Sequence, residues 1–137
     1  MTDSQTLVDA ARQIAQQSYS PYSKFAVGAA ILWDDATLSV GVNVENASYP
    51  LSVCAERSAV SAGIADGKRR IVKVAVWADV DDVIAPCGAC RQVLYEFCGG
   101  EAASVEVILA GRQQVRSTSL DVLLPDAFGP ESLAQPQ

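Results

Sequence analysis

The sequence contains no histidine. This absence excludes catalysis by a Ser-His-Asp or Cys-His arrangement, and it excludes every zinc site that uses an imidazole ligand. Four cysteines are present, and in a cytosolic chain they are more typical of metal ligands or free thiols than of disulfides.

Positive charge and long apolar runs are also scarce. Lys and Arg number 10 against 16 Asp and Glu, which gives a formal net charge of −6. Attraction to DNA or RNA comes mainly from Lys and Arg, so we expect a small, weakly charged substrate and no nucleic-acid polymer. No apolar run approaches the roughly 18 residues of a membrane span. Residues 1–5 lack the features of a secretion signal, and we expect a cytoplasmic protein without membrane association.

The length of 137 residues predicts one domain over 1–137, with a loose polar tail from about residue 130. Half of the residues are hydrophobic, which is high for a small monomer. We therefore expect apolar surface that is covered by further copies of the chain.

The spacing of hydrophobic residues predicts helices and strands in the order α-β-β-α-β-α-β-β-α. The predicted helices cover Ser4–Gln17, Cys54–Ala65, Cys90–Phe97 and Ser119–Leu124. The predicted strands cover Ala26–Trp33, Leu38–Val42, Ile71–Ala78, Val105–Leu109 and a fifth stretch after a two-residue turn at Gly111-Arg112. This order predicts a three-layer α/β/α fold with one mixed five-stranded sheet, in which the first two strands form a hairpin.

Two separated segments carry the residues that can bind a metal: Cys54-Ala55-Glu56-Arg57 and Pro86-Cys87-Gly88-Ala89-Cys90-Arg91-Gln92. Each segment falls where a loop enters a predicted helix, where free N–H groups and the helix dipole stabilise thiolates. Three cysteines leave one tetrahedral position of a zinc ion for water, which is typical of a catalytic site. Residues i and i+2 of a helix point about 200° apart. Cys54 and Glu56 can therefore face one ion only if Cys54 stands at the very start of its helix.

The residues beside the cysteines also suit this chemistry. Glu56 fits the signature of zinc-dependent nucleobase deaminases, in which Cys-x-Glu is followed by Pro-Cys-x-x-Cys. Three thiolates leave a Zn²⁺ centre with a formal charge of minus one, which makes it a poor Lewis acid. We expect Arg57 to offset this charge by donating to the ligand sulfurs.

Two other interpretations of the cysteines remain open at this point. Cys87-Gly88-Ala89-Cys90 alone is compatible with thiol–disulfide redox chemistry, although the combination with Cys54 and Glu56 favours zinc. A structural zinc ion would usually recruit a fourth protein ligand, and Cys98 is the only cysteine left for that role. Cys98 follows an apolar stretch, and we expect it to be a buried thiol.

Over nearly its whole length, from Tyr19 to Gly129, the chain resembles the small, three-cysteine cytidine deaminases that form homotetramers. The resemblance rests on the two cysteine segments, the second extended to Leu94, and on three further motifs: Phe25-Ala26-Val27-Gly28-Ala29-Ala30, Asn43-Val44-Glu45-Asn46-Ala47-Ser48-Tyr49 and Leu123-Leu124-Pro125-Asp126-Ala127-Phe128-Gly129.

This resemblance implies roles for individual residues. Cys54, Cys87 and Cys90 would bind one zinc ion per subunit, and Glu56 would be the proton shuttle. The residues implied to bind the nucleoside are Phe25 at the pyrimidine ring, Asn43 and Glu45 at the ribose hydroxyls, Ala55, and Phe128 from a neighbouring subunit. The resemblance also implies a homotetramer, and the position of Phe128 would make its active sites shared between subunits.

The implied activity is hydrolytic deamination of free cytidine and deoxycytidine to uridine and deoxyuridine, in pyrimidine salvage. Zinc-bound hydroxide would attack C4 of the ring, and ammonia would leave. The family often has Pro where Ala26 stands and commonly has Gly where Pro50 stands, and we expect these departures to affect fine specificity. The competing functions are deamination of another aminated ring, a non-catalytic zinc-stabilised assembly module, and a thiol oxidoreductase.

Overall fold

The structure is a computed structural model that describes residues 3–134. Its centre is a five-stranded sheet with the strand order β2-β1-β3-β4-β5. The strands are β1 Val27–Trp33, β2 Leu38–Val42, β3 Ile71–Ala78, β4 Glu106–Ala110 and β5 Val115–Ser119. Only β3 and β4 pair in parallel, and the other neighbours are antiparallel. The parallel pair follows from the helical crossover that joins these two strands.

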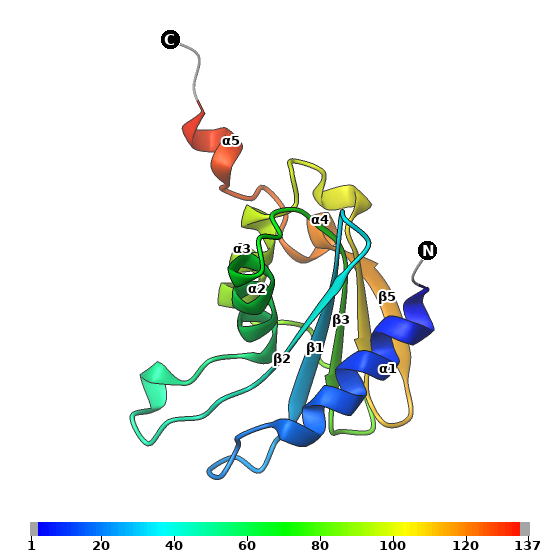
Figure 1. Ribbon diagram of the computed structural model, residues 1–137, viewed down its shortest axis with the longest axis vertical. Helices are drawn as coiled ribbons and strands as arrows, with labels where there is room; N and C mark the ends of the chain where they lie inside the picture. The colour runs from blue at the N-terminus through cyan, green and yellow to red at the C-terminus, as the bar shows by residue number, and fades with distance from the viewer. Residues whose placement is uncertain (1–2, 135–137) are drawn as a thin grey trace.

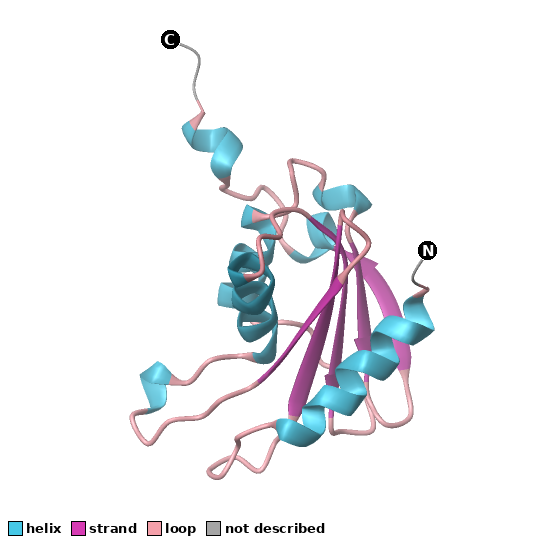
Figure 2. Ribbon diagram, in the orientation of Figure 1, coloured by secondary structure: helices cyan, strands magenta, loops and turns pink. Residues whose placement is uncertain are grey.

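Helices cover both faces of this sheet (Figures 1 and 2). The helices are α1 Ser4–Ile14, α2 Ala55–Ala65, α3 Gly88–Glu96, α4 Leu120–Leu123 and α5 Pro130–Leu133, with 3₁₀ turns at Ala15–Gln17, Tyr49–Leu51 and Ala102–Ser104. Helix α1 lies on one face, and α2 and α3 lie on the other. The predicted three-layer α/β/α fold with a mixed five-stranded sheet is confirmed, and so is the hairpin of its first two strands.

Strand β1 contributes to two separate hydrophobic cores. Its alternate residues Ala29, Ile31 and Trp33 join the core under α2 and α3. The residues between them, Ala30 and Leu32, join the core under α1. A strand that is covered on both faces has no side that can be polar, which explains its continuous apolar sequence.

Helix α2 approaches the sheet closely because small residues and a polar contact permit it. The indole N–H of Trp33 donates to the Ser39 hydroxyl at 2.8 Å, and this hydroxyl donates to the carbonyl of Ala59 at 2.8 Å. Gly63 lies against the Trp33 ring, so that an added Cβ would be only 2.2 Å from a ring carbon. These contacts fix the depth of α2 on the sheet, and thereby the position of its first residues.

The structure differs from the prediction at two connections. Helix α3 begins at Gly88, two residues before the predicted start, because Cys87 is its N-cap. The predicted turn at Gly111-Arg112 is wrong by one residue, since Gly111 N–H donates to the carbonyl of Gln114 and the turn centres on residues 112–113. Gly111 is instead needed because a Cβ there would lie 1.9 Å from the carbonyl of Asp82.

The C-terminal segment was predicted to be a loose polar tail. It contains helix α5 over Pro130–Leu133, and residues 135–137 lie outside the described part of the chain, so the loose tail stays a prediction. Residues 3–134 include no helix with the length and apolar character needed to cross a membrane.

The close approach at Gly63 gives a test of the packing. Gly63→Ala is expected to lower the free energy of unfolding by about 2 kcal/mol, because overpacking a rigid ring costs more than the gain in helix propensity. Urea denaturation measures this quantity. The exposed Ser61→Ala change on the same helix serves as the control and is expected to be neutral or slightly stabilising. An equally stable Gly63→Ala protein would contradict this account of the contact.

Candidate metal centre

Three cysteines that lie far apart in the sequence meet at one point. The Sγ atoms of Cys54, Cys87 and Cys90 all lie within 4.8 Å of one another. Cys54 Sγ is 3.9 Å from Cys87 Sγ, and Cys87 Sγ is 3.5 Å from Cys90 Sγ. The remaining cysteine, Cys98, is buried elsewhere in the core, as predicted.

Two helix N-termini create this meeting point. Cys54 is the N-cap of α2 and Cys87 is the N-cap of α3, and both have extended backbone angles. Cys90 lies in the first turn of α3 and is completely buried. The prediction that Cys54 stands at the very start of its helix is therefore confirmed. Free N–H groups and the positive ends of two helix dipoles surround the sulfurs and favour thiolates.

The spacing of the sulfurs fits a zinc ion. Thiolates bound tetrahedrally at about 2.3 Å from zinc lie about 3.8 Å apart, close to the two separations observed. The chain already favours one thiolate among the three. The pKa of Cys54 is lowered to about 6, chiefly by a hydrogen bond from the Cys90 thiol, with further help from Cys87 and Arg57. The donation raises the pKa of Cys90 far above its usual range.

Glu56 lies next to the sulfurs and is nearly inaccessible to solvent, with 5% of its surface exposed. Burial raises the pKa of this carboxyl to about 7, and the charge of Cys54 adds to the effect. A carboxyl group whose pKa lies near neutral pH can both accept and donate protons under physiological conditions. Glu56 thus has the protonation behaviour that a proton shuttle needs.

Two arginines brace the metal-binding segments. The guanidinium of Arg57 donates to the carbonyl of Ser52 at 3.2 Å, and its Nε is buried without an acceptor among the described residues. Arg91 donates from Nε to the carbonyl of Pro86 at 2.7 Å and from Nη1 to the carbonyl of Leu123 at 2.8 Å. The Nε of Arg57 is thus available to a ligand sulfur, and the guanidinium also helps to lower the pKa of Cys54. Donation from Arg57 to the metal-bound sulfurs stays a prediction.

A cavity of about 240 Å³ opens in front of the sulfurs. Its walls contain six of the predicted site residues: Cys54, Cys87, Glu56, Phe25, Asn43 and Ala55. The structure therefore brings together most of the residues that the sequence analysis singled out. The other wall residues are apolar: Val27, Val76, Ala78, Ile84 and Ala85.

These apolar wall residues were missed by sequence reasoning. Val76 and Ala78 were predicted only as members of an alternating strand, and Ile84 and Ala85 only as members of a loop. The position of Ile84 and Ala85 directly before Pro86-Cys87 was the one available signal, because residues adjacent to a ligand lie near the ion. An apolar wall suits a flat heterocyclic ring better than a charged group.

Two of the predicted substrate-binding residues do not line this cavity. Glu45 lines a neighbouring hollow of about 340 Å³ together with Tyr22, Ser23, Tyr49 and Ser52. Phe128 lies between α4 and α5 with 59% of its surface exposed, and its carbonyl accepts a hydrogen bond from Gln92 at 2.8 Å. Phe128 is not among the described residues that line the cavity of its own chain.

Comparisons with known proteins bear on this centre. A family model for the cytidine and deoxycytidylate deaminase zinc-binding region matches residues 1–105. A cytidine deaminase of Sporosarcina psychrophila is 42% identical over 132 residues, which cover 96% of this chain and 96% of that protein. A cytidine deaminase of Mycobacterium tuberculosis is 46% identical over 123 residues, covering 90% and 87%. The crystal structure of the Burkholderia pseudomallei cytidine deaminase superposes with a TM-score of 0.86 at 45% identity, covering 93% of this chain and 100% of that one.

A three-thiol centre with a buried carboxyl, on a fold shared with these proteins, defines a zinc-binding deaminase. The chain belongs to the cytidine and deoxycytidylate deaminase family. The two interpretations left open by the Cys-x-x-Cys segment lose their support, because Cys54 completes a three-sulfur set and Cys98 lies outside it.

The contrast between two buried cysteines tests the metal site. Cys90→Ser is expected to reduce bound zinc from about one ion per chain to a small fraction, because one of only three protein ligands is lost. Elemental analysis of the purified protein measures this content. Cys98→Ala is the matched control, since it removes an equally buried thiol outside the sulfur set, and is expected to keep its zinc. Equal zinc contents in the two variants would refute the assignment.

The raised pKa of Glu56 has a consequence for the zinc-free protein. Between the ordinary value of 4.5 and the folded value of about 7, the folded state holds a proton that the unfolded state has lost. Stability therefore falls as pH rises through this window, by an amount on the order of 3 kcal/mol. Glu56→Gln cannot titrate, so the difference in unfolding free energy between the two proteins is expected to change across pH 4.5–7. Urea titrations under reducing conditions measure it, and parallel pH profiles would contradict the effect.

Proposed function

We propose that the protein deaminates free cytidine and deoxycytidine by hydrolysis, giving uridine or deoxyuridine and ammonia, as an enzyme of pyrimidine salvage. The observation that carries this proposal is the placement of three sulfurs within 4.8 Å of one another, with the buried Glu56 in the wall of the same cavity. Cys54, Cys87 and Cys90 would hold the zinc ion. Bound zinc supplies a Lewis acid that makes water a nucleophile near neutral pH.

Glu56 moves the protons of the reaction. Its carboxylate accepts a proton from the attacking water, delivers one to N3 of the pyrimidine, and protonates the departing amino group. The raised pKa supports this sequence, because both forms of the carboxyl are accessible near pH 7. The buried position also excludes bulk water, which would otherwise exchange with the transferred proton.

The rest of the cavity orients the nucleoside. Phe25 and the aliphatic wall residues contact the ring, and Ala55 lines the cavity between Cys54 and Glu56 in the sequence. Asn43 and Glu45 bind the sugar hydroxyls. The amide of Asn43 is already fixed, since Nδ2 donates to the carbonyl of Phe25 at 2.7 Å and Oδ1 accepts from the N–H of Val27 at 3.1 Å. This leaves the second Nδ2 hydrogen for a ligand.

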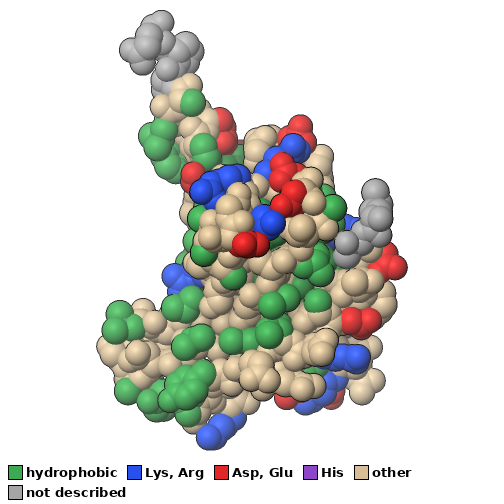
Figure 3. Space-filling view, viewed as in Figure 1, with side chains coloured by type: hydrophobic (Ala, Val, Ile, Leu, Met, Phe, Trp, Pro, Cys, Tyr) green, Lys and Arg blue, Asp and Glu red, His purple; other side chains and the backbone are tan. Residues whose placement is uncertain are grey.

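The proposal includes a homotetramer in which Phe128 enters the site of a neighbouring subunit. Exposed apolar side chains support an assembly. They gather over the projecting segment 43–53, here called the arm, and over the adjacent turn of residues 20–25 (Figure 3). The arm exposes Val44, Tyr49 and Leu51, and the turn exposes Tyr22. Such a patch is typical of a surface that is covered by another chain. Four free thiols support a cytoplasmic location.

The activity is tested by ammonia release across cytidine, deoxycytidine, cytosine, adenosine and guanine, with and without a zinc chelator. We expect release from the first two alone, and loss of it after chelation. Glu56→Gln is expected to retain zinc and to lower kcat at least about 10³-fold, because it removes the proton carrier. A wild-type protein that keeps zinc but deaminates none of these compounds would overturn the proposed function.

A further inference from the structure

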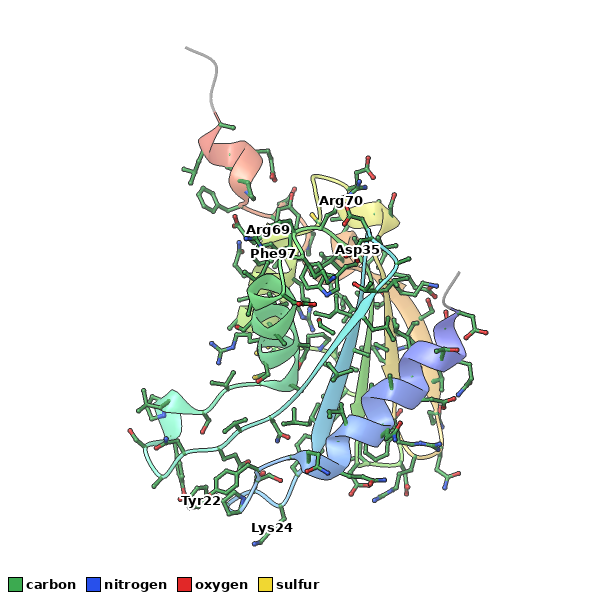
Figure 4. All side chains as sticks on the ribbon, in the orientation of Figure 1. Tyr22, Lys24, Asp35, Arg69, Arg70 and Phe97 are labelled. Atoms are coloured by element: carbon green, nitrogen blue, oxygen red, sulfur yellow. The ribbon has the colours of Figure 1, made fainter. Side chains whose placement is uncertain are left out.

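The segment from Ser20 to Phe25, here called the 20–25 turn, lies against the start of the arm. Its neighbour Tyr19 donates from its N–H to the carbonyl of Asn43 at 3.1 Å and accepts from the N–H of Glu45 at 2.8 Å. Lys24 closes the turn with a left-handed φ of 59° and donates from its N–H to the carbonyl of Ser20. Tyr22 and Lys24 are seen at this end of the molecule in Figure 4, beside the arm.

The 20–25 turn surrounds the carboxylate of Glu45 with donors. Oε1 accepts the N–H groups of Tyr22 at 3.0 Å and of Ser23 at 3.1 Å. Oε2 accepts the hydroxyl of Ser23. These donors, with the Ser23 hydroxyl first among them, hold the pKa of Glu45 below its ordinary value. A carboxylate has about four acceptor positions, so three are filled and one remains on Oε2.

The Ser23 hydroxyl makes a second contact that faces the metal cavity. It accepts the N–H of Phe25 at 3.0 Å, and Phe25 lines the cavity in front of the sulfurs. One hydroxyl therefore connects a wall residue of the metal cavity with the carboxylate in the neighbouring hollow. Tyr22 and Tyr49 lie edge to face across that hollow with ring centroids 5.8 Å apart, which keeps the turn and the arm together.

We propose that Ser23 is a positioning residue for the sugar of the nucleoside: it orients Glu45 so that the one free acceptor position of Oε2 receives a single sugar hydroxyl. This inference rests on the proposed function, because it assumes a nucleoside with its ring in the metal cavity. The Ser23 hydroxyl contacts the carboxylate and does not contact the substrate. Its contribution therefore depends on the presence of a sugar hydroxyl for Glu45 to accept.

Ser23→Ala separates this role from a general effect on the loop. The variant keeps the two N–H donors to Oε1 but frees Oε2, which can then rotate away or be hydrated. For cytidine we expect kcat/KM to fall about tenfold, mainly because KM rises. This is the effect expected when the charge-assisted hydrogen bond between Glu45 and the sugar hydroxyl is partly lost. For 2′,3′-dideoxycytidine, which offers Glu45 no hydroxyl, we expect a change below about twofold. Inhibition constants for uridine and 2′,3′-dideoxyuridine give the same comparison without turnover.

Three further variants control the experiment. Ser23→Thr keeps the hydroxyl and is expected to stay within about threefold of wild type on cytidine. Ser48→Ala removes a hydroxyl of the arm that makes no hydrogen bond within residues 3–134, and is expected to leave both substrates unaffected. In a Glu45→Gln background, Ser23→Ala is expected to lose most of its effect on cytidine, because the two residues act as one unit.

The outcomes are distinct. A selective loss on cytidine that Thr restores supports the inference. An equal loss on cytidine and the dideoxynucleoside, or no loss on cytidine, overturns it while leaving the deaminase activity in place. Failure of the wild-type protein to deaminate cytidine overturns the proposed function itself.

Discussion

The structure depends on two helices that begin at the same point. Helices α2 and α3 pack on the same face of the sheet and against each other, and each has a cysteine as its N-cap. Helix α3 lies in the crossover connection between the parallel strands β3 and β4, and the close contact of Gly63 with Trp33 fixes the distance of α2 from the sheet. Because both dipoles point at the sulfurs, negative charge is favoured where a cation will bind. Every other feature of the centre is arranged around this coincidence of two helix ends.

The local parts of this arrangement could be predicted from the sequence. The spacing of Cys54 and Glu56 requires that Cys54 stand at the start of its helix. In the structure Cys54 is the N-cap of α2. Strand β3 was predicted with its observed bounds, because the alternation of its residues is a pattern contained within the strand itself. Such predictions succeed where the information lies within a few adjacent residues.

The parts that could not be predicted depend on contacts between distant segments. The observed turn lies one residue after the predicted one, and Gly111 lies against the carbonyl of Asp82. No residue near Gly111 in the sequence indicates that contact. Ile84 lines the cavity because the loop before Pro86 lies beside the cysteines. Glu45 came to lie beside the cavity because the 20–25 turn holds its carboxylate. The family resemblance implied that Glu45 binds the sugar, but only the folded chain shows that its carboxylate already accepts three hydrogen bonds.

The two separate cores have a consequence for how the protein can change over time. The chemistry-bearing residues lie on or beside the α2–α3 face, whereas the core under α1 is formed by Leu7, Val8, Ala11 and their partners on the sheet. Substitutions in that second core alter the total stability without displacing a sulfur or the carboxyl group. Mutations in the core under α1 can therefore raise the free energy of unfolding. They would offset the loss of stability caused by mutations near the sulfurs that change substrate range.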